Sequence, residues 1–175
     1  MIEIYTDGAS TQVNKTTYIA DGEIPLFEAG WALCVATGKG TIVRYGYLPV
    51  PSSNNRGELI AVIEALEFIA ATSVNDTFKI YSDSQYVTKG INEYMANWNK
   101  RNWENVKNPD LWKHTYNLWQ KVKSKTTVEW VRGHNGNQGN ELADTYAVFG
   151  KQRKQVVNEK TTAYFIEGNR PYESI

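Results

Sequence analysis

Residues 53–84 read SNNRGELIAVIEALEFIAATSVNDTFKIYSDS, and this stretch decides the fold class. Its first part carries apolar side chains at helical spacing, which predicts a helix over residues 53–72 with Asn54 or Asn55 as its cap. Residues 78–82 then form a short β-rich run. A long helix that leads into a strand is typical of a crossover connection in an α/β sheet.

The residues before this stretch indicate three more strands. Residues 2–7 alternate between apolar and polar side chains and end at Asp7-Gly8, a turn signal, so we expect the first strand to stop there. The polar residues 9–28 are expected to form a long loop. The β-rich runs at 29–37 and 41–48 flank a Gly-Lys-Gly turn and predict a hairpin.

The residues after this stretch alternate between helix and strand signals. Asp83-Ser84 can cap a helix that we expect to break near Lys89-Gly90 and to resume through Trp98. The remaining predicted elements are a basic connector at 99–108, a helix at 109–123 that begins on Pro109, a strand at 127–131, a loop at 132–140 and a helix at 141–149. The order predicts an α/β fold: a mixed five-stranded sheet, with three antiparallel strands and then parallel strands, and helices on both faces.

Length and composition exclude several classes of protein. The 175 residues, 41% hydrophobic and 22% charged, fit one compact domain or a domain with a tail. No apolar run approaches the ~18 residues that span a bilayer, so no membrane segment is expected. The N-terminus begins in a strand pattern rather than a secretory signal, and the single Cys34 excludes an intramolecular disulfide framework. We therefore expect a cytoplasmic location.

The charges are unevenly distributed although the formal net charge is zero. Residues 1–83 carry 5 basic and 10 acidic side chains, whereas residues 84–125 carry 8 basic and 3 acidic ones. This asymmetry suggests a cation site in the first half and a polyanion contact in the basic middle third. Charged side chains that simply face solvent explain the asymmetry equally well.

Four acidic residues stand out by position: Asp7 at the end of the first strand, Glu58 in the first turn of the long helix, Asp83 after the strand at 78–82, and Asp144 early in the last helix. If the first and fourth strands are parallel neighbours, both aspartates leave the sheet at the edge where α/β proteins bind ligands. An all-oxygen cluster of this kind suits Mg²⁺ or Mn²⁺ rather than Zn²⁺. Taken singly, each acid also fits a structural role as a turn residue, a helix cap or a charge at a helix start.

Five short motifs carry a family resemblance. The chain contains five segments that resemble, in order, successive motifs of type 1 ribonuclease H. They are residues 5–9 (YTDGA), 54–59 (NNRGEL), 81–87 (YSDSQYV), 130–134 (WVRGH) and 139–144 (GNELAD). A single such motif is weak evidence, but five in matching order and approximate spacing are strong. The resemblance covers residues 1–150, implies a ribonuclease H-like fold for that catalytic domain, and leaves residues 151–175 as a C-terminal extension without a counterpart.

This resemblance implies a metal-dependent endonuclease that cuts the RNA strand of an RNA–DNA hybrid and leaves 5′-phosphate and 3′-hydroxyl ends. It implies that two Mg²⁺ ions, with Mn²⁺ as a substitute, are held by Asp7, Glu58, Asp83 and Asp144. Asp7 is expected to be the bridging ligand because it lies at the centre of the predicted sheet. Two metals about 3.5–4 Å apart can activate a water and stabilise the leaving oxygen of a phosphodiester. The expected partner is the hybrid, with no membrane contact, and the chain is expected to act as a monomer.

Three further residues have expected roles, and that of His134 comes from the resemblance. His134, in a glycine-flanked loop, would assist proton transfer or product release. Glu141 lies one turn before Asp144 and would modulate the metal site, whereas His114 is interpreted as structural or solvent-facing.

Recognition of RNA requires small polar groups that contact the 2′-hydroxyl. Asn54, Asn55 and Gln85 adjoin the acids in sequence and are expected to supply them. By resemblance, Ser53 and Asn108 would hold a phosphate of the DNA strand. Tyr94 and Trp98, four residues apart, would line the DNA groove beside the basic connector, whereas core packing is the preferred interpretation of Trp112 and Trp119.

Two departures from the family pattern are visible: residues 10–28 contain one glycine where a glycine-rich loop is usual, and the connector at 99–108 is short. The 162–166 segment of the tail could pack as a further strand. Two alternatives to the hybrid-cutting nuclease are a nucleic-acid-binding module without chemistry and an enzyme of the same fold that acts on DNA or double-stranded RNA. The four intact acids argue against the first, and the asparagine pair with Gln85 favours the hybrid.

Overall fold

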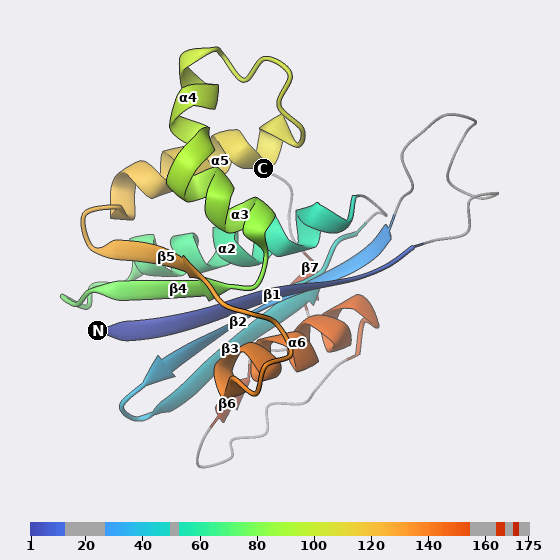
Figure 1. Ribbon diagram of the computed structural model, residues 1–175. Coiled ribbons are helices and arrows are strands. Elements are labelled where there is room, and N and C mark those ends of the chain that lie inside the picture. The colour runs from blue at the N-terminus through green and yellow to red at the C-terminus, as the bar shows by residue number, and fades with distance from the viewer. Residues whose placement is uncertain (13–26, 50–52, 155–163, 167–169, 172–175) are drawn as a thin grey trace.

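The structure is a computed structural model that describes residues 1–12, 27–49, 53–154, 164–166 and 170–171 (Figure 1). The loop predicted at 9–28 is wrong at both ends, because residues 9–12 belong to β1 and residues 27–28 to β2, and its remainder, 13–26, lies outside the described residues. The strands are β1 (Ile2–Gln12), β2 (Phe27–Thr37), β3 (Gly40–Tyr47), β4 (Phe78–Ser82), β5 (Thr126–Trp130), β6 (Tyr164–Ile166) and β7 (Arg170–Pro171). The helices are α2 (Asn54–Ala71), α3 (Gln85–Lys89), the π-helical turn η1 (Gly90–Tyr94), α4 (Met95–Lys100), α5 (Pro109–Val122) and α6 (Gln138–Lys151).

The strands form one mixed sheet in the order β5-β4-β1-β2-β3-β6, with β7 also pairing with β3. Strands β1, β2 and β3 are antiparallel neighbours, whereas β4 is parallel to β1 and β5 is parallel to β4. This confirms the predicted five-stranded mixed sheet. The C-terminal extension adds two short parallel strands to β3, so that the tail strand expected within 162–166 is found at Tyr164–Ile166.

Helices cover the sheet on both sides, as predicted (Figure 1). The larger core lies between the sheet and the layer that contains α2 and α5, and its largest fully buried side chains include Trp31 and Trp112. A smaller core lies under α6, where Cys34, Tyr45 and Ala147 are buried. Trp119 packs against the larger core, so core packing of Trp112 and Trp119 is confirmed. Among the helices in the described ranges, none combines the length and the apolar character needed to cross a bilayer.

The prediction that the first strand ends at Asp7-Gly8 is wrong. Strand β1 continues to Gln12, and Asp7 lies just beyond the last pair of β1 with β4, Thr6 with Ser82. Gly8 is a contact residue rather than a turn residue, because a Cβ there would lie 2.5 Å from the backbone nitrogen of Glu58. The absence of a side chain therefore allows α2 to approach β1 closely.

Several predicted boundaries also shift. Helix α2 begins at Asn54, and Ser53 occupies the N-cap position without a side-chain cap bond, so neither asparagine caps the helix and Glu58 falls in the second turn. Helix α6 begins at Gln138 rather than 141, because Asn137 Oδ1 accepts a hydrogen bond from the Asn140 backbone N–H at 2.9 Å and starts the helix early.

The predicted helix break at Lys89-Gly90 is wrong, because the helix continues there as a wider π-helical turn. The chain passes from α3 through η1 into α4 without leaving the helical region. Gly90 begins the π-helical turn, and a Cβ there would overlap the buried ring of Trp112. Ser84 caps α3 as predicted: the Val87 backbone N–H donates to its hydroxyl oxygen at 3.2 Å.

Candidate active site

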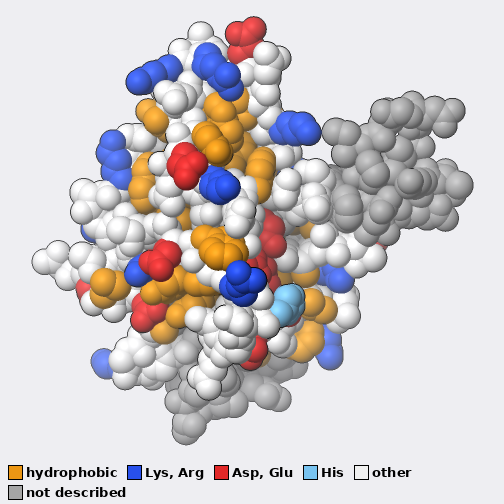
Figure 2. Space-filling view, viewed as in Figure 1, with side chains coloured by type: hydrophobic (Ala, Val, Ile, Leu, Met, Phe, Trp, Pro, Cys, Tyr) orange, Lys and Arg blue, Asp and Glu red, His pale blue; other side chains and the backbone are white. Residues whose placement is uncertain are grey.

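Three carboxylates from distant parts of the chain meet where β4 ends beside β1. One oxygen from each of Asp7, Glu58 and Asp83 lies within 4.8 Å of the other two. Asp7 belongs to β1, Asp83 directly follows β4, and Glu58 comes from α2. In the space-filling view, acidic side chains gather near the middle of the face shown, with lysine and arginine side chains around them (Figure 2).

The backbone of Gly8 fixes two of these carboxylates. Its N–H donates to Asp7 Oδ1 at 2.9 Å and to Glu58 Oε2 at 3.1 Å. The missing side chain that admits α2 thus also brings Glu58 within reach of this donor. Sequence reasoning missed the second function, because nothing in the motif indicates that one backbone N–H serves both acids.

The end of β5 and the loop after it pack against Asp83, the third carboxylate. Trp130 Nε1 donates to the backbone oxygen of Asp83 at 3.1 Å. A Cβ on Gly133 would lie 2.8 Å from Asp83 Oδ2, so a larger residue there would press on this oxygen. The next residue, His134, is exposed and has a left-handed backbone conformation (φ 54°). The structure thus places the histidine backbone next to the acidic cluster and its side chain at the surface.

Asp144, on α6, borders the cluster from the other face of the sheet. It is half-buried and is not one of the three acids within 4.8 Å, yet it lies near enough to Asp7 to help raise the pKa of that carboxyl. Its negative charge also acts on Glu58. Two elements on opposite faces, α2 and α6, therefore bring acids to the same point of β1.

Burial and mutual repulsion make this cluster reluctant to ionise. Asp7 is 3% exposed, and burial, followed by the charges of Glu58 and Asp83, raises its pKa from 3.8 to about 11. Burial and the charge of Asp83 raise the pKa of Glu58 from 4.5 to about 8. A divalent cation would relieve this repulsion, and the all-oxygen donor set fits Mg²⁺ or Mn²⁺.

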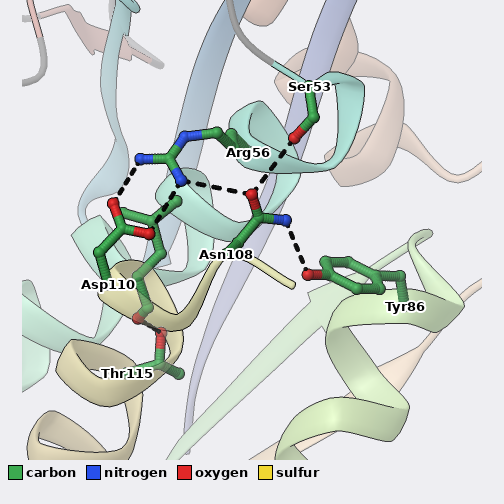
Figure 3. Close-up of polar contacts among 7 residues, drawn as sticks. Ser53, Arg56, Tyr86, Asn108, Asp110 and Thr115 are labelled. Carbon is green, nitrogen blue, oxygen red and sulfur yellow. Dashed lines mark hydrogen bonds and ion pairs between the residues drawn. The ribbon is translucent and has the colours of Figure 1, made fainter. Parts of the chain in front are cut away.

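Ser53 and Asn108 are brought together beside the start of α2 (Figure 3). The Ser53 hydroxyl donates to Asn108 Oδ1 at 3.4 Å, and Arg56 Nη1 donates to the same oxygen at 3.3 Å. Asn108 Nδ2 donates to the Tyr86 hydroxyl at 3.0 Å. Arg56 also forms an ion pair with Asp110 at 2.7 Å. Sequence reasoning did not predict this network, because the partners come from three segments and Asn108 adopts a left-handed conformation (φ 53°).

The other predicted substrate-binding residues are near the surface. Asn54 and Gln85 are exposed and Asn55 is half-buried. Tyr94, 45% exposed, stacks on Trp98 with their ring centroids 5.8 Å apart. Trp98 in turn meets Trp112 edge to face at 5.1 Å, so this ring contributes to the core as well as to the surface.

Two residues with predicted secondary roles can also be placed. His114 Nε2 lies 3.0 Å from Glu67 Oε1, which fits its interpretation as structural. Glu141 is exposed and lines a cavity with Tyr5 and Cys34. Its predicted effect on the metal site stays a prediction.

A mixed sheet with a carboxylate cluster beside a parallel strand end defines a class: α/β enzymes that act on phosphate esters with divalent cations. Within that class, the RNase H family model matches residues 1–152, and the chain belongs to this family.

Comparisons with named relatives agree with membership of this family. "Ribonuclease H" of Orientia tsutsugamushi (strain Boryong) is 35% identical over 173 residues, which cover 95% of this chain and 92% of the relative. "Ribonuclease H" of Cupriavidus pinatubonensis (strain JMP 134 / LMG 1197) is 42% identical over 123 residues, 67% of this chain and 81% of the relative. The chain is thus a ribonuclease H-type nuclease, as the motifs predicted.

Solved structures share the fold. LC9-RNase H1, described as a type 1 RNase H with the type 2 active-site motif, is 25% identical with a TM-score of 0.59, over 86% of this chain and 72% of that one. The prototype foamy virus protease-reverse transcriptase is 25% identical with a TM-score of 0.68, over 90% of this chain and 21% of that one. LC11-RNase H1, solved in complex with an RNA/DNA hybrid, is 19% identical with a TM-score of 0.55, over 85% of this chain and 97% of that one, and shows likeness of fold.

Proposed function

We propose that this chain hydrolyses the RNA strand of RNA–DNA hybrids and leaves 5′-phosphate and 3′-hydroxyl ends. The observation that carries the proposal is the meeting of Asp7, Glu58 and Asp83 within 4.8 Å, with Asp144 against Asp7. Membership of the RNase H family and a fold shared with a hybrid-bound RNase H1 support the choice of substrate. We assign the activity to residues 1–150 of a monomer and treat residues 151–175 as an extension.

In this proposal Asp7, Glu58, Asp83 and Asp144 hold two Mg²⁺ ions, for which Mn²⁺ substitutes. The bound ions supply an activated water and a stabilised leaving oxygen. The Gly8 N–H orients Asp7 and Glu58, because it donates to both carboxylates. Asp7 is the most buried of the four acids, and the charges of the other three all raise its pKa, so it would be the acid placed to serve both ions.

His134 exchanges a proton with the reacting phosphate group or with the product as it leaves. Its side chain is exposed, and the adjacent Gly133 lies against Asp83. Histidine is the side chain that most often transfers protons in enzyme active sites.

The hybrid lies across the carboxylates and the segments that flank them. Asn54, Asn55 and Gln85 contact the 2′-hydroxyl groups of the RNA strand. The pair formed by Ser53 and Asn108 holds a phosphate of the DNA strand, since the serine hydroxyl and the asparagine amide already face one another. The stacked rings of Tyr94 and Trp98 line the DNA groove.

The experiment compares cleavage of four substrates: hybrid, duplex RNA, duplex DNA and single-stranded RNA, each with Mg²⁺ and with EDTA. We expect cleavage of the RNA strand of the hybrid, in Mg²⁺ only. Asp7→Asn should abolish this cleavage and keep hybrid binding. Asp76→Asn is the matched control, because the same chemical change is made at an aspartate that pairs with the N-terminus at the opposite end of the sheet. Cleavage retained by Asp7→Asn would contradict the metal role, and preference for another duplex would contradict the substrate.

A further inference from the structure

A polar contact joins the two elements that carry Asp7 and Asp144. Lys151, the last residue of α6, donates from Nζ to the Thr11 hydroxyl oxygen in β1 at 2.8 Å. Thr11 is exposed and Lys151 is half-buried, so this contact lies at the surface. Among the residues that the structure describes, no carboxylate forms an ion pair with Lys151.

The contact is aligned with the catalytic acids. Lys151 follows Asp144 by seven residues, which is two helical turns on the same side of α6 and about 10.5 Å along it. Thr11 follows Asp7 by four residues on the same face of β1, about 13 Å along the strand. The Lys151–Thr11 contact thus lies farther along the same helix and strand that carry Asp144 and Asp7.

The chemistry of this contact suits an anion. An ammonium group has three donors, and only one is used by Thr11. The Thr11 hydroxyl accepts this bond and keeps its own hydrogen to donate. Lys151 also lines a cavity of about 490 Å³ with Arg153 and Glu28, whose charges together amount to +1. Arg153 is occupied elsewhere, because its guanidinium lies over the Tyr47 ring, 4.5 Å from the centroid.

The backbone position of Lys151 is set by packing against β2. A Cβ on Gly30 would lie 2.2 Å from the backbone nitrogen of Lys151, so the end of α6 rests directly on β2. The lysine therefore begins from a fixed backbone position, and an anion bound there would lie at a fixed distance from the carboxylates.

We propose that Lys151 and Thr11 bind a phosphate of the strand that is cut, two to four nucleotides from the cleaved bond. The spacing supports this distance, because successive phosphates advance about 3.4 Å along a duplex axis and lie farther apart through space. The strand whose phosphate reaches Asp7 and Asp144 then continues over the surface past Thr11 and Lys151. This inference rests on the proposed function, since it requires a polynucleotide at the carboxylates.

The competing explanation is structural: a cation at the end of a helix stabilises its dipole and needs no ligand. Hybrid binding separates the two. It is measured by fluorescence anisotropy in an Asp7→Asn background, which prevents cleavage, at several salt concentrations. We expect Lys151→Gln to weaken binding roughly sixfold at 0.1 M salt and to reduce the slope of log K against log salt by about 0.7–0.9, the effect of one lost phosphate contact. Thr11→Val should weaken binding by a smaller factor.

Lys39→Gln is the matched control, because it makes the same charge change in the exposed β2–β3 turn beyond the other end of the sheet. Lys151→Arg keeps the charge and should bind like the unsubstituted chain. Thermal unfolding of each variant shows whether it folds. A Lys151→Gln protein that binds as the Lys39→Gln protein does would overturn the proposal.

A neutral methylphosphonate placed at single RNA positions on both sides of the scissile bond locates the contact. At one position two to four nucleotides away, the neutral group should lower the hybrid affinity of the unsubstituted Lys151 protein by the same factor as Lys151→Gln does. It should not lower the hybrid affinity of the Lys151→Gln protein any further. Equal losses in both proteins at every position would overturn the proposal. An unsubstituted chain that neither binds nor cuts hybrid refutes the proposed function itself, whereas an active chain indifferent to Lys151 refutes this inference alone.

Discussion

Replacing Asp7 by Asn should stabilise the metal-free protein near neutral pH. Folding places this carboxyl at 3% exposure beside Glu58, Asp83 and Asp144, and raises its pKa from 3.8 to about 11. An acid whose pKa is raised by folding contributes its full stability only below its unfolded-state pKa, and this contribution is lost as the pH rises towards the folded-state value. Asparagine does not titrate, and its side-chain oxygen can still accept the Gly8 hydrogen bond that Asp7 accepts at 2.9 Å.

The magnitude follows from the interval between the unfolded pKa and the working pH. At pH 7 the interval is about three units, which corresponds to about 4 kcal/mol at 1.36 kcal/mol per unit. The charges of Asp7 and Glu58 depend on one another, and Asp83 is only half-buried, so solvent screens part of the repulsion. We therefore expect Asp7→Asn to raise the free energy of unfolding at pH 7 by about 2–3 kcal/mol.

The assay is urea unfolding in EDTA at pH 5, 6, 7 and 8. The unsubstituted chain should lose stability across this range, because Asp7 and Glu58 take up protons on folding, and Asp7→Asn should lose less. Mg²⁺ should restore stability to the unsubstituted chain by binding the folded state, and should do so less for the variant. Asp76→Asn is the control with the opposite sign, since the N-terminal ammonium group lowers the pKa of that carboxyl. Equal pH slopes for Asp7→Asn and the unsubstituted chain would refute this account.

Three further substitutions test the packing and the proton transfer. Gly8→Ala should lower the free energy of unfolding by about 1–3 kcal/mol and weaken Mg²⁺ binding, because its Cβ would meet the α2 backbone at 2.5 Å; calorimetry and Mg²⁺ titration measure both. Gly133→Ala should weaken Mg²⁺ binding with little change in hybrid affinity, whereas Gly38→Ala, with no atom within 4 Å of its Cβ, should behave like the unsubstituted chain in both tests. His134→Ala should slow turnover about 10²-fold or less and remove one inflection from the pH–rate profile, and an unchanged profile would exclude its role in proton transfer.

The sequence was sufficient for the order of the elements and for the meeting of Asp7, Glu58 and Asp83. The helical spacing after Asn54, the short strand at Phe78–Ser82 and the Ser84 cap depend on neighbours in the chain, which is why they could be predicted. The convergence of acids from β1 and β4 followed from the rule that parallel strands end at one edge.

The errors have a common cause, which is that the deciding contact comes from elsewhere in the chain. Asp7-Gly8 looks locally like a turn, and only the approach of α2 shows why a glycine stands inside a strand. The helix widening at Gly90 depends on the buried ring of Trp112, and the left-handed Asn108 depends on partners from α2 and α3. Likewise, the pairing of the tail with β3 has no local signal beyond a short β-rich run.

Two glycines of adjacent strands explain why the acidic site and the Lys151–Thr11 contact both lie along β1 and α6. Gly8 in β1 admits α2, which brings Glu58, and Gly30 in β2 admits the end of α6, which carries Asp144 and Lys151. Both helices are thereby held close to the sheet by backbone contact, so their charged groups have little freedom to move apart. Burial at this point, followed by the charges of Glu58 and Asp83, raises the pKa of Asp7. A change that loosens α6 at Gly30 should therefore lower the pKa of Asp7 and weaken hybrid binding together, whereas a change at Lys151 should alter hybrid binding alone.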